Sequence, residues 1–499
     1  ELFPAQEHFL SNMIKQKFHS AIENASPGPK SNQKAFLFLP PWEDHDFALM
    51  FSNMILKELG FEVIYIGKTI SFDSIVQCVE KINDIEEING KADIIRWEIL
   101  YHYGGLFLDA DSICIEPFDQ LINKGSPFAG YENENVRKGL VATGTMAFPK
   151  NHPLPLMAIQ WIKQNEVSKE KTNRMAWQNV GPGLLTGLLN TGNFKDVEIL
   201  PSYYFLPKHA TGIQYMGHAK VYAYQEWGST KRNYDIMNTI ELDDIYKEPK
   251  IWVSVLVSSY NTKHKYIVEC LDSIKNQNGH FGMEIIWIND GSNDLNTKLL
   301  ELTLDEFIKN TRFIKIVYKK WDKNMGIGYS LNQGIKMCSN DIVVKVDSDD
   351  ILLPDRIDKQ INFMNTNKDC MICGCNAHYL REINGNKQIH GETSHKYLLT
   401  WDEYKKNPSH WFINHPCVCY RKHAVLEVGN YNKNTHSLYE DFELELRLLK
   451  HYGKIYNIQE NLLLYRIHDE QVTRNGSTLN NNSVNYRNKF INKLIQQDN

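Results

Sequence analysis

Long apolar runs are missing from this sequence. No stretch of its 499 residues approaches the roughly 20 consecutive apolar residues that a membrane-spanning helix requires, so we expect no membrane span within it. A surplus of basic residues is missing too. The net charge of -5 argues against a nucleic-acid partner, because such proteins concentrate Lys and Arg. We expect a cytoplasmic location, or a membrane-peripheral one if a signal or anchor precedes Glu1, which stands where a native start would have Met.

Cysteines are few and odd in number. There are nine of them, and a chain of this length can bury its own core without a disulfide framework. We therefore expect free thiols and a reducing compartment. Two groups stand out, one of Cys370, Cys373 and Cys375 and one of Cys417 and Cys419. Both lie in apolar, strand-like segments, which favours small buried side chains. A zinc site is the alternative, although the spacings match no familiar pattern of zinc ligands.

Regular alternation of strands and helices fills both halves of the chain. Such alternation is typical of α/β folds with a mainly parallel sheet. We expect strands at 34–39, 61–66, 106–108, 251–257, 284–288, 313–318 and 342–346, and helices at 44–59, 93–103, 264–276 and 324–337. The predicted organisation is a first domain at 1–235 with a helical segment at 1–30, a linker at 236–250, a second domain at 251–475 and a polar tail at 476–499.

In the second half of the chain, one predicted strand ends in a group of acidic residues. The apolar strand 342–346 runs into Asp347, Asp349 and Asp350. Ligands of open α/β sheets bind at the carboxyl ends of the strands, and three carboxylates do not share so small a space without a cation. The spacing suits a hard divalent ion that also takes oxygens from a diphosphate. Solvated turn acids are the alternative, and Asp350 is expected to cap the following turn.

The first half of the chain has a similar predicted strand that ends in acidic residues. The apolar residues 106–108 lead into Asp109 and Asp111. Asp93 and Arg96 lie one helical turn apart shortly before it, so they share a helix face. An N-cap with a surface ion pair is the alternative for these two residues.

The C-terminal half resembles glycosyltransferase family two, whose members have the GT-A fold. The matching pieces are Val253-Ser-Val-Leu-Val-Ser-Ser-Tyr-Asn261, Cys270-Leu-Asp-Ser-Ile-Lys-Asn-Gln277, Ile288-Asn-Asp-Gly-Ser292, Asn324 to Ile335, Val346-Asp-Ser-Asp-Asp350, His415-Pro-Cys-Val-Cys-Tyr-Arg421, Gly429-Asn-Tyr431, Tyr439-Glu-Asp-Phe-Glu443 and Tyr465-Arg-Ile-His468. The resemblance implies an inverting, metal-dependent transferase that uses a nucleotide-sugar donor.

The same resemblance implies roles for individual residues. Donor binding falls to Ser259, Tyr260, Asn261, Asp290, Asn324 and Asp347. Mn²⁺ or Mg²⁺ would be held by Asp349, with Asp347 and His468 beside it. Asp441 would be the catalytic base and Glu440 would hold the acceptor. Three alternatives stay open: helix capping by Asp441, a structural role for His468, and either sugar stacking or core packing for Trp411.

The N-terminal half resembles glycosyltransferase family 32, also of the GT-A fold, through Asp93-Ile-Ile-Arg96 and Tyr103-Gly-Gly-Leu-Phe-Leu-Asp-Ala-Asp111. Gly181-Pro182 adds a weaker piece. The resemblance implies a retaining transferase with a second Mn²⁺ or Mg²⁺ on Asp111 and Asp109. Donor contacts would come from Asp93, Arg96, Asp109 and Trp42. The chain departs from the family in having Gln225-Glu-Trp-Gly-Ser-Thr230 where a His and a Ser-Trp pair are usual.

Together the two halves predict a bifunctional glycosyltransferase. Its donors would be nucleotide sugars, UDP-sugars in particular, and its acceptor a glycan or a lipid-linked or protein-linked glycoconjugate. One alternative is that the first half only binds a nucleotide sugar or glycan, which the altered segment at 225–230 favours. Another is a nucleotidyltransferase, which usually has a Gly-rich loop and a Lys after its first strand; neither half has one.

Overall fold

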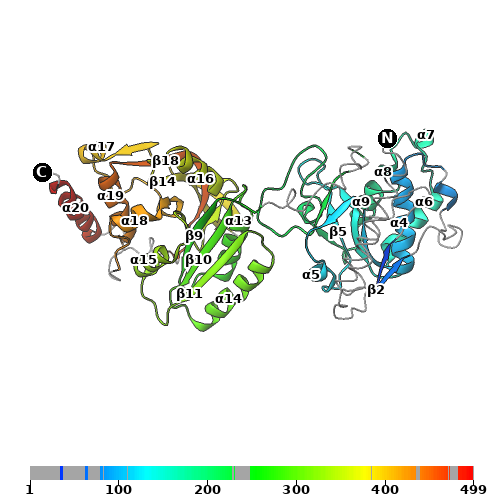
Figure 1. Cartoon of the computed structure of the whole chain (residues 1–499), viewed down its shortest axis with the longest axis horizontal. Coiled ribbons are helices and arrows are strands. Elements are labelled where there is room, and N and C mark those ends of the chain that lie inside the picture. The colour runs from blue at the N-terminus through cyan, green and yellow to red at the C-terminus, as the bar shows by residue number, and fades with distance from the viewer. Residues whose placement is uncertain are drawn as a thin grey trace, which may run out of the picture. The chain divides into compact units, whose positions relative to one another are not determined.

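A computed structural model describes residues 34–37, 62–65, 79–82, 84–109, 111–227, 230, 248–383, 385–433, 439–469, 471 and 481–497. The chain divides into two compact units, one formed by Glu1–Tyr215 with Val221–Ile245 and the other by Met216–Lys220 with Tyr246–Asn499 (Figure 1). The predicted segment 1–30, the predicted helix 44–59 and Trp42 lie outside the described residues. No helix among the described residues is both long and apolar enough to cross a membrane.

The first unit is built around a four-stranded sheet of order β3-β6-β5-β7. Its strands are β3 (Gly105–Leu108), β5 (Phe128–Tyr131), β6 (Val141–Phe148) and β7 (Glu198–Leu200). The pairs of β6 with β3 and β5 are antiparallel, and β5 pairs with β7 in parallel. The predicted first two strands form a parallel pair, β1 (Lys34–Leu37) and β2 (Glu62–Tyr65). Helices and strands therefore mix as an α/β fold requires, with more antiparallel pairing in this unit than the alternation suggested.

One long helix covers the sheet of the first unit and carries part of its site. Helix α4 (Ile88–Tyr103) starts five residues before the predicted Asp93, and Gly104 ends it with a φ of 68°. Its buried residues Ile94, Trp97 and Leu100 pack in one hydrophobic cluster with Met146 and Phe148 of β6. The turn at Gly104 then leads the chain directly into β3, whose end carries Asp109.

The second unit has a ten-stranded sheet whose main path runs β11-β10-β9-β12-β17-β14-β18-β13, where β13 is the short strand Ile351–Leu352. Its first four strands are β11 (Ile314–Lys320), β10 (Gly282–Asn289), β9 (Trp252–Ser259) and β12 (Ile342–Asp347), all mutually parallel. β17 (Cys419–Arg421) pairs antiparallel with both β12 and β14 (Ile372–Ile383), and β14 runs parallel to β18 (Lys454–Arg466). The four strands predicted from apolar runs are confirmed, with bounds that differ by at most two residues.

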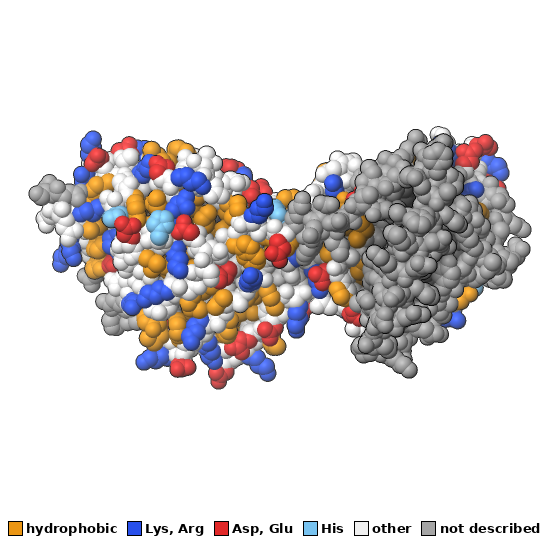
Figure 2. Space-filling model, viewed as in Figure 1, with side chains coloured by type: hydrophobic (Ala, Val, Ile, Leu, Met, Phe, Trp, Pro, Cys, Tyr) orange, Lys and Arg blue, Asp and Glu red, His pale blue; other side chains and the backbone are white. Residues whose placement is uncertain are grey.

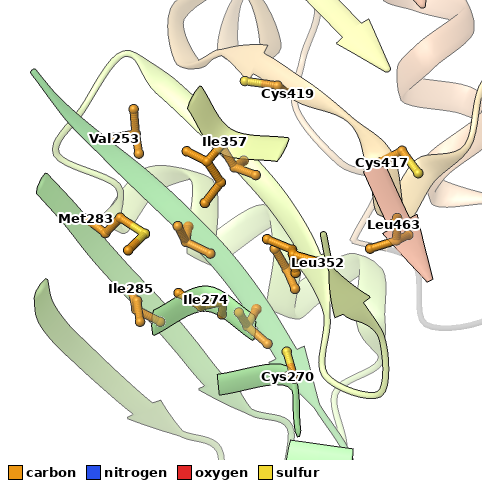
Figure 3. Packing of buried hydrophobic residues seen from close by; sticks show 14 of the residues in the cluster. Val253, Cys270, Ile274, Met283, Ile285, Leu352, Ile357, Cys417, Cys419 and Leu463 are labelled. Carbon is orange, nitrogen blue, oxygen red and sulfur yellow. The ribbon is translucent and has the colours of Figure 1, made fainter. Parts of the chain in front are cut away.

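Helices cover both faces of this sheet. α13 (His264–Lys275), α14 (Asp294–Lys309) and α16 (Arg356–Thr366) bury their apolar sides on one face, together with Val253, Val255 and Val257 of β9. Figure 3 shows Val253, Met283 and Ile285 of neighbouring strands in one layer with Ile274 and Cys270 of α13. α15 (Ile327–Met337) and α19 (Glu440–Tyr452) cover the opposite face, against Leu256 and Ile288. Burial on both faces explains why these strands are continuous apolar runs.

Five residues of the predicted first domain belong to the second unit. Met216–Lys220 lies against α13 and the start of β11 rather than with its neighbours in sequence. The backbone N–H of His218 donates to Lys275 O (2.8 Å), and the His218 carbonyl accepts from Arg312 N (2.8 Å). Both ring nitrogens of His218 also lie on backbone carbonyls, at 3.0 Å from Gln277 O and 2.7 Å from Phe281 O. A segment of five residues is too short to show a periodic pattern. The domain boundary predicted from composition therefore assigned it to the first domain.

Within the predicted polar tail, residues 481–496 form a helix. α20 (Asn481–Gln496) packs beside α19 (Figure 1), and Ile491 and Leu494 are buried in the core of the second unit. Lys450 of α19 donates to the carbonyl of Leu494 (2.6 Å). The composition hid this helix because its apolar residues are few, but their spacing places them on one face.

The clustered cysteines are buried, as predicted. Cys370, Cys373, Cys375, Cys417 and Cys419 all lie within the hydrophobic cluster of Figure 3. Within the part of the chain that the structure describes, no group of cysteines gathers closely enough to hold an ion. The thiols therefore pack as small apolar side chains, and the zinc alternative has no support there.

Candidate functional site

Three carboxylates converge at the carboxyl end of β12. One oxygen atom from each of Asp347, Asp349 and Asp350 lies within 4.8 Å of the others. β12 is the strand where the parallel part of the sheet meets its antiparallel part, and side chains at such an edge converge on a ligand. The sequence prediction of an acidic cluster at this strand end is confirmed.

Buried cations hold these acids in place. Lys345 is fully buried in β12, and its Nζ donates to Asp347 Oδ1 and to the carbonyl of Val346 (3.1 Å). Burial opposes ionisation of Asp347, but the ammonium of Lys345 lowers the pKa of that carboxyl below its usual value. The sequence reasoning passed over Lys345. A lysine inside a run of valines was the available signal, since a buried lysine needs a carboxylate partner.

Asp349 is paired with a histidine from the far end of the sheet. His468 Nε2 lies 2.8 Å from Asp349 Oδ2. Arg466, also buried, donates from Nε to the Asp349 carbonyl (2.6 Å) and from Nη2 to Glu269. The structure thus brings His468 next to Asp349, the predicted metal ligand. This contact gives His468 a structural role, and its imidazole would also lie beside an ion bound to Asp349.

Asp350 does not cap the following turn. Its Oδ1 accepts from the backbone N–H of Arg466 (2.8 Å), and it is fully buried. The cap position of α16 is Asp355. Burial, and then the nearby charges of Asp349 and Asp347, raise the pKa of Asp350 well above its usual value. The strand β18, remote in sequence, supplied a partner that no local pattern could indicate.

Two further acids open helix α19. Glu440 and Asp441 are its first two residues, and the cap position belongs to Tyr439, so Asp441 is not the N-cap. Asp441 is half-buried and its Oδ1 accepts from the next backbone N–H, that of Phe442 (2.7 Å). Glu440 is buried, and among the described residues its Oε2 has no hydrogen-bond partner. Burial and then the charge of Asp441 raise the pKa of Glu440 to about 8.

A glycine brings the start of α15 against this pair. A Cβ at Gly328 would lie 2.4 Å from the carbonyl of Asn432 and 3.2 Å from Glu440 Cβ. Only glycine therefore allows the start of α15 to approach the acids of α19 this closely.

The two sets of acids belong to one site. His415 and Lys345 act electrostatically on the carboxylates of both Asp347 and Glu440. The imidazole of His415 is buried, with Nδ1 3.0 Å from Glu445 Oε1. Burial opposes its charge, but the Glu445 carboxylate raises the pKa of His415. Lys345 and His415 therefore lie within electrostatic reach of both the strand-end acids and the α19 acids.

The predicted donor residues at the end of β9 take different positions. Ser259 is buried, and its hydroxyl accepts from the indole N–H of Trp287 (3.0 Å), so that hydroxyl faces the core. Tyr260 is 51% exposed. Asn261 has a φ of 50°, and its Oδ1 accepts from Asn293 N (2.9 Å), which ties the end of β9 to that of β10. The alternation of side chains along β9 decides that Ser259 points inward.

The predicted donor residues Asp290 and Asn324 each accept a hydrogen bond from the backbone of the loop that follows β11. Asp290 is buried, and its Oδ1 accepts from Met325 N (2.8 Å). Burial raises its pKa despite that hydrogen bond. Asn324 is exposed, and its Oδ1 accepts from Gly326 N (2.9 Å). Asp290 therefore shapes the loop that carries Asn324, and both stay predicted donor residues.

Trp411 is on the surface. Its side chain is 56% exposed, and its ring meets His395 edge to face at 5.1 Å. The alternative of core packing for Trp411 is therefore wrong.

The N-terminal acids form a second site around one arginine. Arg96 donates from Nη1 to Asp93 Oδ1 (2.5 Å) and from Nη2 to Asp109 Oδ1 (2.6 Å). Thr143 donates to the same Asp93 oxygen (2.8 Å). Burial raises the pKa of Asp93 to about 6, against the opposing charge of Arg96. Asp93 lies inside α4 and both partners are buried, so the alternative of an N-cap with a surface ion pair is wrong.

Gln225 completes this second site. Its Nε2 donates to Asp109 Oδ2 (3.2 Å) and to Asp111 Oδ1 (3.1 Å). β8 (Ala223–Gln225) pairs antiparallel with β4 (Ser112–Cys114), which brings Gln225 opposite Ser112. The departure from the family pattern at 225–230 therefore falls directly on the acids. Gly181 also touches the site, because a Cβ there would lie 2.2 Å from Asp93 Oδ2.

The two units differ in how well they fit a divalent ion. In the second unit the three carboxylates offer a hard, all-oxygen set that suits Mg²⁺ or Mn²⁺, and Asp350 Oδ2 is buried without a partner among the described residues. In the first unit the amide nitrogen of Gln225 and the guanidinium of Arg96 take up oxygens of Asp109 and Asp111. An ion there would need Gln225 to turn its amide oxygen inward, and the second metal site stays a prediction.

The fold and the acid cluster of the second unit define an α/β enzyme of the GT-A type. The family model "Glycosyl transferase family 2" matches residues 254–429. A UDP-Gal:alpha-D-GlcNAc-diphosphoundecaprenol beta-1,3-galactosyltransferase of Escherichia coli is 32% identical over 45% of this chain and 77% of that protein. The amylovoran biosynthesis glycosyltransferase AmsE of Erwinia amylovora is 29% identical over 44% of this chain and 78% of its own. The chain belongs to glycosyltransferase family 2 through its C-terminal unit.

The N-terminal unit matches a different model, "Glycosyltransferase sugar-binding region containing DXD motif", at residues 51–127. That range includes Asp93, Arg96, Asp109 and Asp111. Among solved structures, S. aureus TarS 1-349 in complex with UDP is 17% identical with a TM-score of 0.38, over 49% of this chain and 65% of that one. The recognition of two glycosyltransferase halves of different families is confirmed.

Glu440→Gln should change how the stability of the second unit depends on pH. The folded-state pKa of Glu440, about 8, lies above its ordinary value of 4.5. The stability that this group contributes is therefore complete below the ordinary value and is lost as the pH rises through about 8. Gln does not titrate, so the variant should gain stability relative to the wild type between about pH 5 and about pH 9. Thermal unfolding of both proteins across this range tests the sign, and parallel curves would contradict it.

Arg96→Ala should strongly destabilise the first unit. It leaves the buried carboxylate of Asp93 and the partly buried carboxylate of Asp109 without their shared cation, which costs about 3 kcal/mol or more. Lys124→Ala is the matched control, because its ammonium pairs with Glu198 and both side chains are exposed, and such surface pairs contribute about 1 kcal/mol at most. Chemical denaturation of the full chain measures both changes. Equal losses for the two variants would show that Arg96 does not hold the acids.

Proposed function

We propose that the chain transfers sugars from nucleotide-sugar donors, UDP-sugars in particular, to a glycan or glycoconjugate acceptor. The observation that carries this is the single site made by the strand-end acids of β12 and the first two residues of α19. The Escherichia coli relative, named for a UDP-Gal donor and a diphosphoundecaprenol-linked acceptor, supports a UDP-sugar and makes a lipid-linked acceptor the first to test.

In the second unit, Asp349 and Asp347 would hold Mn²⁺ or Mg²⁺ with His468 beside them. The ion, when bound, neutralises charge that develops on the leaving diphosphate. Lys345 keeps Asp347 ionised and fixed from beneath. The exposed ring of Tyr260, with Asn324 and Asp290, would face the nucleotide at the ends of β9 and β10.

Asp441 would act as the base of an inverting transfer. It would accept the proton of the acceptor hydroxyl as that oxygen attacks the sugar carbon. Two adjacent ionised carboxylates repel each other, and the raised pKa of Glu440 resolves this by keeping Glu440 protonated near neutral pH. A protonated Glu440 can donate a hydrogen bond to the acceptor, which leaves the role of base to Asp441. This division of roles supports the assignment of the base to Asp441.

In the first unit, Asp93, Arg96 and Asp109 would hold the donor sugar and diphosphate of a retaining transferase, with Trp42 as a further predicted contact. The competing function is a module that binds a nucleotide sugar or glycan without turnover. The hydrogen bonds of Gln225 to both Asp109 and Asp111 favour that second function, because an amide donor occupies oxygens that an ion would need.

Asp349→Ala and Asp111→Ala should separate the two halves. A panel of nucleotide sugars with Mn²⁺ is scored for hydrolysis by the full chain. Asp349→Ala should lower hydrolysis of the donor used by the second unit at least about 100-fold, because charge on the leaving group loses its stabilisation. Asp111→Ala should do the same for a donor used by the first unit, if that unit turns over.

Asp402→Ala is the matched control, since its exposed carboxylate pairs only with Lys405 at the surface. Full activity of Asp349→Ala on every donor would contradict the proposed site. Full activity of Asp111→Ala on every donor would leave the first unit as a binding module.

Asp441→Asn should abolish transfer and spare donor binding. Loss of a general base costs about 1,000-fold in rate, whereas UDP affinity should change by less than about twofold. Transfer to an α-GlcNAc-diphospholipid and UDP binding by calorimetry are the measurements. Asp294→Asn, in the first turn of α14, controls for loss of a carboxylate at a helix start. Unfolding of Asp441→Asn alone would indicate a structural role instead.

A further inference from the structure

Two stacked aromatic rings lie at the first turn of α19, and an exposed tryptophan, Trp411, precedes a phenylalanine that packs against that turn. Tyr439 directly precedes Glu440, and its ring stacks on that of Tyr486 of α20 with centroids 4.8 Å apart and planes 23° apart. The Tyr486 side chain is 39% exposed, and Trp411, with its 56% exposed ring, lies on the neighbouring loop. Over the visible face of the second unit, acidic and basic side chains are interspersed (Figure 2), so no field of one sign sets this region apart.

The stacked tyrosines are fixed to the turn that carries Asp441. The hydroxyl of Tyr486 donates to Glu443 Oε1, and the other oxygen of Glu443 accepts from Asn432 Nδ2 (3.0 Å). Glu443 is itself buried. The guanidinium of Arg487 lies 5.2 Å from the ring centroid of Tyr439. The position of Tyr486 relative to the base is therefore set by a buried carboxylate and not by surface chance.

Helix α20 also holds the loop that carries Trp411. His410 Nε2 lies 2.7 Å from Asn488 Oδ1 of α20. On the other side of Trp411, the ring of Phe412 lies 6.1 Å from that of Phe442, the residue after Asp441. The two chain neighbours of Trp411 are thus anchored, His410 to α20 and Phe412 to α19.

Aromatic rings beside the proposed catalytic base are suited to bind the saccharide of the acceptor. The face of an aromatic ring is electron-rich, and the C–H groups on one side of a pyranose are weakly positive, so the two stack favourably. Binding sites for small molecules are lined by such rings with a few fixed polar groups. Tyr439 and Tyr486 stand beside the proposed base, and Trp411 lies on the anchored loop.

We propose that Trp411, Tyr439 and Tyr486 form a subsite for the acceptor saccharide, with α20 as its outer wall. This inference rests on the proposed function, because the subsite serves the acceptor of the Asp441 reaction. α20 lies beyond residues 254–429, which the family model matches. The subsite therefore supplies acceptor specificity from a segment outside the range that the family model matches, and its ligand is a neutral hexose or N-acetylhexosamine of a glycan.

Binding of saccharides to the UDP-loaded full chain tests this subsite. The probes are the methyl α- and β-glycosides of glucose, galactose, N-acetylglucosamine and N-acetylgalactosamine and their common disaccharides, followed by saturation-transfer NMR and calorimetry. Trp411→Ala and Tyr486→Ala should each weaken the best saccharide about tenfold. Tyr486→Phe keeps the ring and loses only the bond to Glu443, so it should retain most of the saccharide affinity.

Tyr397→Ala is the matched control. Its ring is 50% exposed but meets Phe363 and Tyr456 edge to face, so saccharide affinity should match that of the wild type. A wild type that binds UDP but no saccharide, or Ala variants that bind saccharides normally, would overturn the subsite. Failure of the wild type to bind UDP would instead overturn the proposed function. Circular dichroism of each variant confirms that α20 stays folded.

Discussion

Pairing of buried charge is the constraint on which the second unit depends. Its site gathers acids from β12 and from α19, and carboxylates so close together repel unless cations stand among them. Lys345, buried in the central strand, supplies one such charge directly beneath Asp347. His415 lies 3.0 Å from Glu445, whose carboxylate raises the pKa of the imidazole. The acids can thus gather at this edge of the sheet because the protein carries part of the neutralising charge itself.

The first unit meets the same constraint with different residues. Arg96 joins Asp93 to Asp109 through a planar guanidinium, whose fork allows two carboxylates to be held at once. Gln225 then bonds to Asp109 and Asp111 with a neutral amide in place of a charged or metal-binding group. The two units therefore share a sequence motif and an α/β fold but not an electrostatic design. A similar acidic strand end does not imply a similar dependence on metal.

The parallel core and the acidic strand ends follow from the sequence because they rest on local periodicity. Strands buried on both faces need continuous apolar runs, so β9, β10, β11 and β12 could be predicted within a few residues. Positions set by distant partners could not. Asp350 was expected to cap a turn but bonds to Arg466 in β18, more than a hundred residues away. Met216–Lys220 joined the second unit through backbone hydrogen bonds, which leave no trace in side-chain composition.

The sequence alone determined the class of protein: order and spacing of the motifs carry the family, and the acids carry the chemistry of a diphosphate-bound ion. Only the tertiary structure decided which side chains remain available. It turned the Ser259 hydroxyl toward Trp287, brought Gln225 onto the acids, left Trp411 at the surface and folded residues 481–496 of the polar tail into a helix beside the proposed base. The reason is physical. A motif fixes residue types along the chain, whereas exposure, pKa and hydrogen-bond partners depend on neighbours that only folding brings together.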